Sequence, residues 1–501
     1  MWKKAFSKRT RIEESVIPIV YYTLFLFYFF YLCYSCLIET NRMKNYLSYT
    51  LALIVVVLVG LLLMNHVPSI SIFNKQMRKV DLLGDIRKEK VVIDSTSFLD
   101  TIPMPSVAKP AFVDSCKKGM TCIEDYSDST QRGMSLFYEA LSQKIENKEP
   151  VRIAVFGDSF IEADIFTADL RELLQNKYGG KGVGFVPITS LVYGFRPTVY
   201  HRFDGWDTHT VTDSVYFDYS KQGVSGHYYI PTYEGAYVEL RGQRKYASNL
   251  EVADLSTIYF KNNDSLTLSV KVNYNEPIFH DIPASKKLDK LTIEDNIERV
   301  RWTVESCDST YFYGIAMDGA SGIILDNFSL RGSSGTSLQS IPAKMLKEFN
   351  ALRPYDLVIL QYGLNVASEQ NLDYDYYYKK MLPNVEHIKK CFPEAGLLLV
   401  SVGDRDYKTE TGDVKTMPGV KSLVQYQQKI AAKSNIAFWN LFEAMGGDES
   451  MASLVHDNPS KANYDYTHIN FRGGKHLAEI LYETLIYGKE QYDKRKAYEK
   501  E

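Results

Sequence analysis

The stretch Val151-Arg-Ile-Ala-Val-Phe-Gly-Asp-Ser-Phe160 decides the fold of this chain. Apart from Arg152, its first six residues are apolar and prone to form a β-strand, and they lead directly into the turn Gly157-Asp-Ser159. A helical pattern of apolar residues follows at once. The residues on its apolar face are Ile161, Ile165, Leu170, Leu173 and Leu174. A strand, a glycine turn and an amphipathic helix predict the first unit of a parallel α/β sheet.

Ser159 is expected at the carboxyl end of this strand, where parallel α/β sheets bind their ligands. The tripeptide is weak evidence by itself, because a serine at this place often only caps the following helix. A chemical role for Ser159 requires that the rest of the chain supply a base, an acid that orients the base, and donors for an oxyanion.

Length and composition exclude several classes of protein. The 501 residues leave room for about two or three domains and a sizeable core. The formal net charge of -3 gives no basic footprint, so we expect no nucleic-acid partner. The sequence has no HExxH, paired CxxC or EF-hand pattern, so neither a metal nor a cofactor is predicted.

The six cysteines are too few for a disulfide scaffold in a protein of this size. They are residues 33, 36, 116, 122, 307 and 391. Cys116 and Cys122 are near enough in sequence to close a small loop in an oxidising compartment. Two reduced thiols are the alternative, and the sequence leaves this choice open.

Residues 1–67 are predicted to form a membrane anchor with one or two transmembrane helices. Apolar stretches cover residues 16–38 and 46–67, and both approach the roughly 20 residues that span a bilayer. A buried core helix is the alternative, but neither stretch has the polar face that such a helix usually presents to solvent.

The charges around these stretches give conflicting predictions of topology. Five basic residues between positions 3 and 11 place the N-terminus in the cytoplasm by the positive-inside rule. Two spans would then return the chain to the cytoplasm, and the basic residues between positions 75 and 88 agree with this. If translation starts at Met43, residues 46–67 instead form a signal anchor, and one span takes all that follows outward.

Residues 68–130 show little sustained periodicity, and we expect a spacer there. A helix over residues 133–148 then leads to the opening strand. The glycine-rich stretch 179–187 lacks the GxxxxGK[ST] spacing of a phosphate loop, so we expect a mobile loop that lines the site.

From residue 201 to residue 315 the sequence alternates with a period of two, as in Leu266-Thr-Leu-Ser-Val-Lys-Val272. Short alternating strands between Gly, Asn, Asp and Ser predict an antiparallel β-sandwich. It is inserted into the α/β domain, which therefore comprises residues 131–200 and 316–490. The many Tyr residues, with Trp206 and Trp302, would suit glycan binding through exposed rings. The alternative is that most of these rings belong to the core.

The α/β pattern resumes after this insertion, with a strand from Asp326 that ends in a turn at Gly332. Further buried strands are predicted over residues 355–361, 396–402 and 436–442. Helices are predicted over residues 338–352, 422–433 and 473–486. The motif Gly363-Leu-Asn365 follows the first of these strands, and the motif Asp465-Tyr-Thr-His468 precedes the last helix.

These positions supply the groups that acyl-ester chemistry needs. Ser159 can attack, His468 can take its proton, and Asp465 can hold the imidazole from the same short turn. The oxyanion hole would comprise the backbone N–H groups of Ser159 and Gly332 and the side-chain amide of Asn365.

Each of these residues also has a plainer interpretation. An Asp-x-x-His motif is a frequent coincidence, Asn365 could cap a helix, and Gly332 could only supply a turn with positive φ. Their joint placement at one rim of the same sheet favours the catalytic interpretation.

The same motifs, in the same order, resemble the four blocks of the SGNH (GDSL-like) hydrolases. They are Gly157-Asp-Ser-Phe160, Gly332, Gly363-Leu-Asn365 and Asp465-Tyr-Thr-His468. The resemblance implies a three-layer α/β/α fold with a parallel sheet, and it covers about residues 150–200 and 320–487. A β-sandwich inserted after the first block is similar to the peptidoglycan O-acetylesterase branch, in which the insert resembles a carbohydrate-binding module.

We therefore expect a membrane-anchored serine esterase that removes O-acyl groups, above all O-acetyl, from peptidoglycan or another polysaccharide. This function favours an extracytoplasmic catalytic domain, in the periplasm or on the cell surface. An O-acyltransferase would use the same triad with a sugar hydroxyl in place of water. A non-catalytic glycan-binding surface protein is the alternative from another class.

Overall fold

The computed structural model describes residues 113–127, 133–213 and 215–500, with residues 52, 54–55, 71–72 and 75–76 of the N-terminal part. The chain divides into two compact units, Met1–Ala108 and Lys109–Glu501. In the first unit, β1 (Ser71–Ile72) pairs with β2 (Lys75–Gln76). The apolar stretches 16–38 and 46–67 lie almost wholly outside the described residues, and no described helix is long and apolar enough to cross a membrane.

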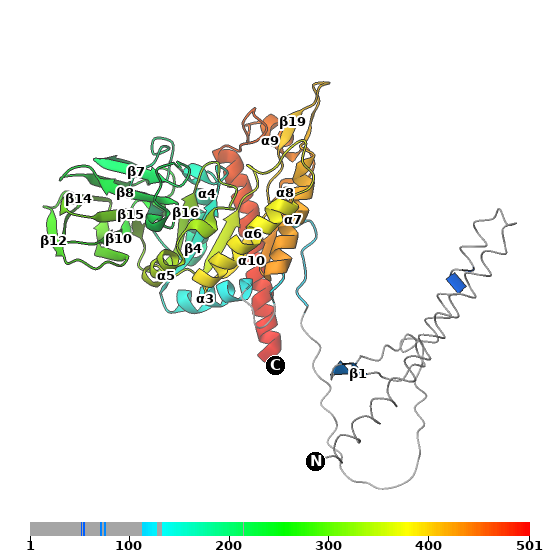
Figure 1. Ribbon diagram of the computed structural model, residues 1–501, viewed down its shortest axis with the longest axis horizontal. Helices are drawn as coiled ribbons and strands as arrows, with labels where there is room; N and C mark the ends of the chain where they lie inside the picture. Colours follow the sequence, from blue (N-terminus) through cyan, green and yellow to red (C-terminus); the bar gives the residue numbers. More distant parts are fainter. Residues whose placement is uncertain are drawn as a thin grey trace, which may run out of the picture. The chain divides into compact units, whose positions relative to one another are not determined.

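A mostly parallel sheet forms the centre of the larger unit, in the order β16-β4-β17-β18-β21-β3 (Figure 1). The bounds are Gly322–Ser329 (β16), Pro150–Gly157 (β4), Leu357–Gln361 (β17), Gly396–Val400 (β18), Ala437–Trp439 (β21) and Glu124–Asp125 (β3). All pairings are parallel except that of β3 with β21. The strands β17 and β18 are buried throughout, which explains why their sequences are continuous apolar runs.

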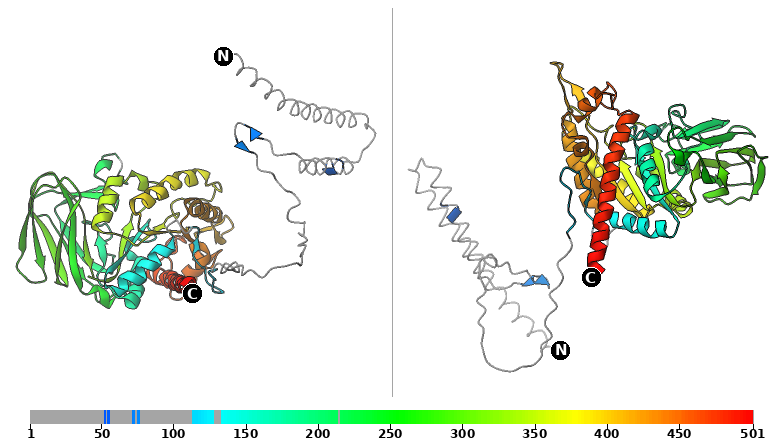
Figure 2. Two further views of the ribbon diagram at one scale, coloured as in Figure 1. Left: turned by 90° about the horizontal axis from the view of Figure 1, so that it is seen from below. Right: turned by 180° about the vertical axis from the view of Figure 1, so that it is seen from behind.

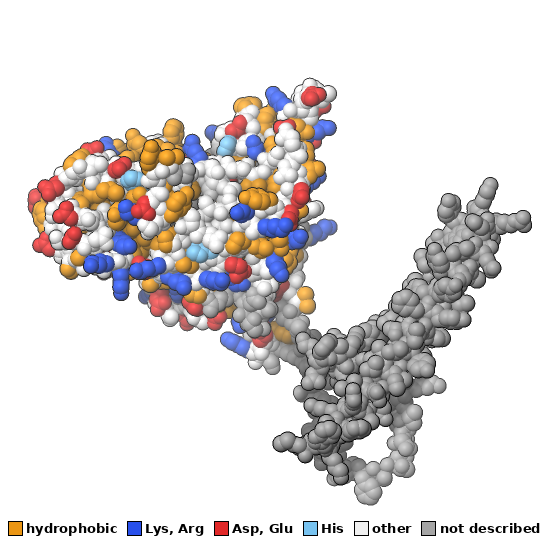
Figure 3. Space-filling view, in the orientation of Figure 1, with side chains coloured by type: hydrophobic (Ala, Val, Ile, Leu, Met, Phe, Trp, Pro, Cys, Tyr) orange, Lys and Arg blue, Asp and Glu red, His pale blue; other side chains and the backbone are white. Residues whose placement is uncertain are grey.

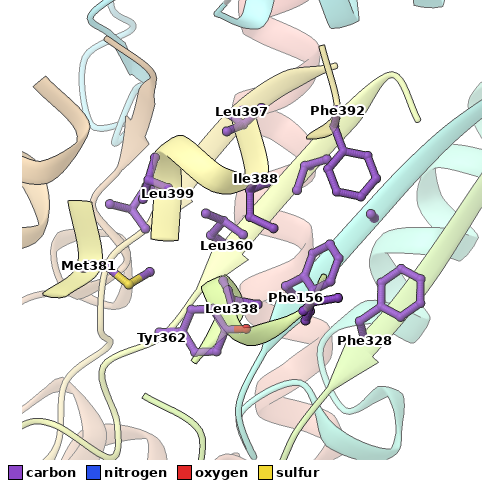
Figure 4. Close-up of a cluster of buried hydrophobic side chains, with 14 of the residues drawn as sticks. Phe156, Phe328, Leu338, Leu360, Tyr362, Met381, Ile388, Phe392, Leu397 and Leu399 are labelled. Carbon is purple, nitrogen blue, oxygen red and sulfur yellow. The ribbon is translucent and has the colours of Figure 1, made fainter. Parts of the chain in front are cut away.

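Helices cover both faces of this sheet. On one face lie α5 (Ala343–Leu352), α6 (Asp375–Cys391) and α7 (Gly419–Ser434). On the other lie α3 (Met134–Glu146), α4 (Thr167–Tyr178), α8 (Leu441–Met445), α9 (Ser450–His456) and α10 (Phe471–Lys500). Alternate side chains of β4 enter different cores, because Phe156 packs with α6 (Figure 4) whereas Val155 packs with α4 and α10. The expected α/β layers are present.

Two antiparallel sheets lie among the described residues from 184 to 318 (Figure 2). One has the order β13-β10-β15-β8-β7 with β5 beside β15, and the other has the order β12-β11-β14-β9-β6. Their bounds are Gly184–Val186 (β5), Val199–Asp204 (β6), Trp206–Thr210 (β7), His227–Pro231 (β8), Tyr237–Gly242 (β9), Ala253–Asn262 (β10), Leu266–Val272 (β11), Ile278–Ile282 (β12), Asp289–Ile297 (β13), Arg299–Cys307 (β14) and Thr310–Asp318 (β15). Inward side chains of both sheets, among them Trp302 and Phe312, form one shared core. Hydrophobic side chains also gather on the surface over β7 and β8 (Figure 3).

The glycine-rich stretch 179–187 does not line the site, so the prediction of a mobile loop there is wrong. A Cβ on Gly180 would lie 2.4 Å from the carbonyl oxygen of Ile323, and one on Gly182 would lie 2.2 Å from that of Met317. Ile323 is at the amino end of β16, whereas Ser159 follows the carboxyl end of the parallel neighbour β4. The glycines therefore permit close packing at the opposite end of the sheet.

Part of the predicted spacer 68–130 belongs to the α/β unit. The strand β3 pairs with β21, and the indole N–H of Trp439 donates a 2.9 Å hydrogen bond to the carbonyl of Thr121. Cys116 and Cys122 form a disulfide beside this strand. No apolar or alternating pattern predicts β3, because this strand consists of the two polar residues Glu124 and Asp125.

Candidate active site

Ser159 lies in the turn directly after β4. The backbone of this turn leaves little space, since a Cβ on Gly157 would lie 2.9 Å from the carbonyl oxygen of Gln361 on β17. After the turn, the N–H of Glu162 donates to the carbonyl of Ser159 over 3.3 Å. The close approach of two strand ends thus requires glycine two residues before the serine.

The helix expected directly after Ser159 begins later, at Thr167. Ala163 and Asp164 have positive φ angles of 54° and 63°, which interrupt a helix. Asp164 is fully buried and accepts hydrogen bonds from Arg196 (2.9 Å) and Thr198 (2.5 Å), which precede β6. The contacts of this carboxylate fix the backbone in a conformation that the local sequence does not predict.

The structure brings His468 and Asp465 to Ser159. The distance from Ser159 Oγ to His468 Nε2 is 3.2 Å, and that from His468 Nδ1 to Asp465 Oδ2 is 2.8 Å. Because an ionised carboxylate only accepts hydrogen bonds, this contact places the imidazole proton on Nδ1. Nε2 can then accept the hydroxyl proton of Ser159.

Asp465 is held as a carboxylate. Burial by itself would raise its pKa, but hydrogen bonds from the backbone N–H and the ring of His468 and from the N–H of Thr467 outweigh burial and lower the pKa. The backbone bonds are 3.0 Å each. The turn is anchored on its other side, where the N–H of Asp406 donates to the carbonyl of Tyr466 over 3.0 Å.

Asn365 also lies at this rim, after the end of β17. Its side-chain N–H groups donate to Asp158 Oδ2 (3.2 Å) and to the carbonyl of Ser333 (3.0 Å). Gly332 is exposed, with a φ of +77°, in the turn after β16. This turn is tied to the strand before Ser159, because the N–H of Leu330 donates to the carbonyl of Gly157 over 2.9 Å.

Asp158 is a site residue to which the sequence reasoning assigned no role. It is fully buried, and Phe160 N–H donates to its Oδ1 over 2.9 Å. Burial raises the pKa of Asp158 to about 6, although these hydrogen bonds and the charge of His468 act in the opposite direction. The only sequence signal for this role was its position inside the motif.

A second missed feature is the ion pair between Glu162 and Arg331. The guanidinium Nε lies 2.9 Å from Glu162 Oε2, and the Arg331 side chain is 67% exposed. The pair joins the segment after Ser159 to the turn of Gly332. No sequence pattern could have predicted it, because the two residues are 169 positions apart.

No cluster of His, Cys, Asp or Glu that could hold a metal ion occurs in the part of the chain that the structure describes. The groups at this rim are instead a hydroxyl, an imidazole, a carboxylate and an amide. Such a set can transfer a proton from the hydroxyl to the imidazole and can stabilise the imidazolium that results.

No family model matches this sequence, and no curated protein matches it as a relative. Its fold is similar to that of a peptidoglycan O-acetylesterase, with a TM-score of 0.60 and 22% identity over 74% of this chain and 99% of the other. This likeness establishes the fold.

Two family-two carbohydrate esterases are more distant. The enzyme from Cellvibrio japonicus has a TM-score of 0.24 and 11% identity, over 60% of this chain and 98% of its own. The enzyme from Clostridium thermocellum, in complex with cellohexaose, has a TM-score of 0.27 and 12% identity, over 57% and 100%.

Proposed function

We propose that this chain is a membrane-anchored serine esterase that hydrolyses O-acyl esters, above all O-acetyl esters, on a cell-wall or other polysaccharide. The observation that supports this most is the contact of Ser159 with His468, which is in turn bound to Asp465. The fold shared with a peptidoglycan O-acetylesterase agrees with this chemistry.

In the proposed first step, Ser159 Oγ attacks the ester carbonyl while His468 Nε2 takes its proton. The tetrahedral intermediate collapses when the C–O bond to the sugar breaks, and His468 returns the proton to the departing sugar oxygen. Water then attacks the acyl-enzyme with His468 again as base, the bond from the acyl carbon to Ser159 Oγ breaks, and His468 returns the proton to Ser159 Oγ as the free acid leaves. Asp465 keeps the imidazole in the required tautomer and stabilises its charged form.

We assign the oxyanion to the N–H groups of Ser159 and Gly332 and to the amide of Asn365, as the sequence predicts. One such donor typically contributes about 2.7–4 kcal/mol to the lowering of the barrier. Both N–H groups of Asn365 already have acceptors, namely Asp158 and the carbonyl of Ser333. Donation to the oxyanion therefore requires that the amide share or exchange one of them.

Hydrolysis is favoured over acyl transfer to a sugar by the openness of the site. The side chains of His468 and Asp465 are 41% and 49% exposed, so water reaches the imidazole freely. An acyltransferase that uses the same triad must exclude water from the acyl-enzyme. A non-catalytic glycan-binding protein would have no need for the 3.2 Å contact between Ser159 and His468.

We further propose that residues 1–67 anchor the protein and that the catalytic unit is extracytoplasmic. The disulfide between Cys116 and Cys122 supports this compartment, because disulfides persist in oxidising environments. Protease treatment of spheroplasts tests it. Cleavage of the catalytic unit in intact spheroplasts is expected, and its protection would contradict the placement.

Acetate release from polysaccharide tests the activity itself. Full-length protein in a neutral detergent is incubated with O-acetylated peptidoglycan and with acetylated xylan, and the S159A variant is the control. We expect acetate from at least one polymer and none above background with S159A. If neither polymer loses acetate faster with the wild-type chain than with S159A, the proposed substrate class is wrong.

A further inference from the structure

Basic side chains gather on the outward face of the sheet β12-β11-β14-β9-β6. Alternation along the strands separates the two faces, so that Val238 and Leu240 of β9 enter the core while Arg241 is exposed. The outward cations are Arg202, Arg241, Lys271, Arg299 and Arg301. They come from β6, β9, β11 and β14.

Four of these cations lie directly opposite another cation on the neighbouring strand, whereas Arg202 lies opposite Glu239. Arg299 is directly opposite Arg241, and Lys271 is directly opposite Arg301. The carboxylate of Glu239 accepts 2.8 Å hydrogen bonds from both Arg299 and Arg301. Arg241 forms no ion pair with any described residue. Like charges directly opposite each other destabilise a sheet. Glu239 offsets this repulsion at Arg299 and Arg301, and a bound anion would offset it at Arg241.

A hollow of about 310 Å³ lies at the end of this face. Its charged and aromatic lining consists of Tyr200, Arg241, Arg244, Lys245, Glu251 and Glu298. The ring of Tyr200 is 41% exposed, and the guanidinium of Arg202 lies 4.9 Å from its centre. The side chain of Arg244 is 76% exposed, and its guanidinium lies 3.6 Å from the carboxylate of Glu251. Because exposed ion pairs contribute little, this contact holds Arg244 weakly.

We propose that this hollow binds a carboxylate-bearing sugar of an acidic polysaccharide. Arg241 and Lys245 donate charge-assisted hydrogen bonds to the carboxylate, and Tyr200 packs its ring against the apolar face of the sugar. Glu251 and Glu298 accept hydrogen bonds from sugar hydroxyls. The choice of a polysaccharide rests on the proposed function, since the bound polymer is then the one that presents esters to Ser159.

The two glutamates argue against a nucleic acid in the same place. A nucleic acid presents a phosphate at every nucleotide and would bring negative charge against Glu251 and Glu298. A polysaccharide can carry carboxylates on some sugars and hydroxyls on all of them. Its carboxylates can bind the cations of the hollow, and its hydroxyls can donate to the glutamates. The mixed charge of the hollow therefore fits an acidic sugar better than a uniform polyanion.

The hollow is linked to the catalytic rim through α4. Tyr246, beside Lys245, donates a 2.5 Å hydrogen bond to Asp169 in the first turn of α4. On the other side, Arg196 precedes β6 and donates to Asp164, five residues after Ser159. The segments that form the hollow are thus attached to the helix that follows the proposed nucleophile.

Binding measurements on the full-length chain in a neutral detergent test this proposal. All variants are made in the S159A background, so that the result does not depend on catalysis. The ligands are polygalacturonate, neutral dextran and a DNA oligonucleotide of comparable charge. We expect binding to polygalacturonate that weakens with salt, and much weaker binding to dextran and DNA.

The test variant is R244Q/K245Q in the hollow. Its matched control is K286Q/K287Q, in the exposed loop between β12 and β13. Loss of charged hydrogen bonds predicts an affinity for polygalacturonate that is about tenfold or more lower in R244Q/K245Q and in R241Q. K286Q/K287Q should remain within about twofold of the parent. R241K should fall between the parent and R241Q, because lysine keeps the charge but not the planar fork of donors. Melting temperatures check that each variant is folded.

Equal losses in R244Q/K245Q and K286Q/K287Q would overturn the proposal, because binding would then depend only on net charge. Equal affinity for DNA and polygalacturonate would overturn it as well. Failure of the esterase proposal would instead appear as missing acetate release with binding intact. The two outcomes are therefore distinguishable.

Discussion

The side-chain amide of Asn365 donates a 3.2 Å hydrogen bond to the buried carboxyl group of Asp158, 207 positions earlier in the chain. This bond joins the ends of β4 and β17 beside Ser159. It also sets the direction of the amide that we assign to the oxyanion. Burial raises the pKa of Asp158 to about 6. The hydrogen bonds to its carboxylate therefore offset only part of the cost of burying the charge.

Replacement of Asp158 by Asn should lower kcat. Asp158 accepts with both oxygens, from Phe160 N–H and from Asn365, whereas an asparagine offers only one. Truncation of Asn365 to Ala should cost about 10²–10³ in kcat, and D158N should cost a part of this, measured with p-nitrophenyl acetate. If D158N keeps the full kcat while N365A loses it, Asp158 does not position the amide.

Replacement of Asp465 by Asn should abolish most activity without unfolding the chain. The amide can donate to Nδ1 of His468 and so favours the tautomer with its proton on Nε2, which cannot accept from Ser159. In serine hydrolases this error costs on the order of 10⁴ in kcat. The steady-state rate and the melting temperature of D465N decide the question, and a rate near that of the wild type would remove Asp465 from the triad.

The buried pair Asp404 and Asp406, beside the turn of His468, predicts a pH-dependent stability. Burial, and then the charge of Asp404, raise the pKa of Asp406 to about 7. One of its oxygens accepts from Ala452 N–H over 2.6 Å, and the other has no hydrogen-bond partner among the described residues. Its contribution to stability is therefore fully present below the ordinary aspartate pKa of 3.8 and is lost as the pH rises through the folded-state pKa of about 7.

D406N stays uncharged at every pH and should melt at a higher temperature than the wild type at about pH 8. The difference should shrink at about pH 5, where Asp406 of the wild type is mostly protonated in the folded state. Thermal denaturation at the two pH values measures this. A difference that is independent of pH, or that grows towards low pH, would contradict the assignment.

Arg353 should be a major determinant of stability. It is 2% exposed, and it donates to Asp326 of β16 (2.6 Å) and to Asp318 of β15 (2.5 Å), so it joins the parallel sheet to an antiparallel one. R353M leaves two buried carboxylates without their partner and should cost about 3–5 kcal/mol in the free energy of unfolding. The exposed pair of Arg331 gives a control, since R331M should cost about 0–1 kcal/mol. Denaturant unfolding measures the free energy of unfolding of both variants. Equal losses in R353M and R331M would show that the buried ion pairs of Arg353 contribute no more than an exposed pair.

The central strands and their connections could be predicted because their signal is local. The sequence predicts a strand over residues 151–156, and β4 covers Pro150–Gly157. Continuous apolar runs such as that of β18 arise because both faces of a central parallel strand are covered by helices. Since the carboxyl ends of parallel strands lie at one edge, Ser159 and Asn365 could be placed at the same rim.

The rest depends on contacts between distant residues. The late start of α4 follows from the burial of Asp164 among Arg171, Arg196 and Thr198, and nothing near Asp164 in the sequence indicates these partners. The role of Asp158 depends equally on Asn365. The glycines of residues 179–187 suggested mobility, yet glycine is required there because the backbone of Ile323 lies so close to Gly180.

The most direct test of the central claim is mass spectrometry of the full-length protein, quenched during turnover of p-nitrophenyl acetate. The account predicts one acetyl group on the peptide that contains Ser159, and none on that peptide in S159A. It also predicts that S159A loses a factor on the order of 10⁶ in kcat. Full activity in S159A, or an acetyl group on another residue, would contradict it.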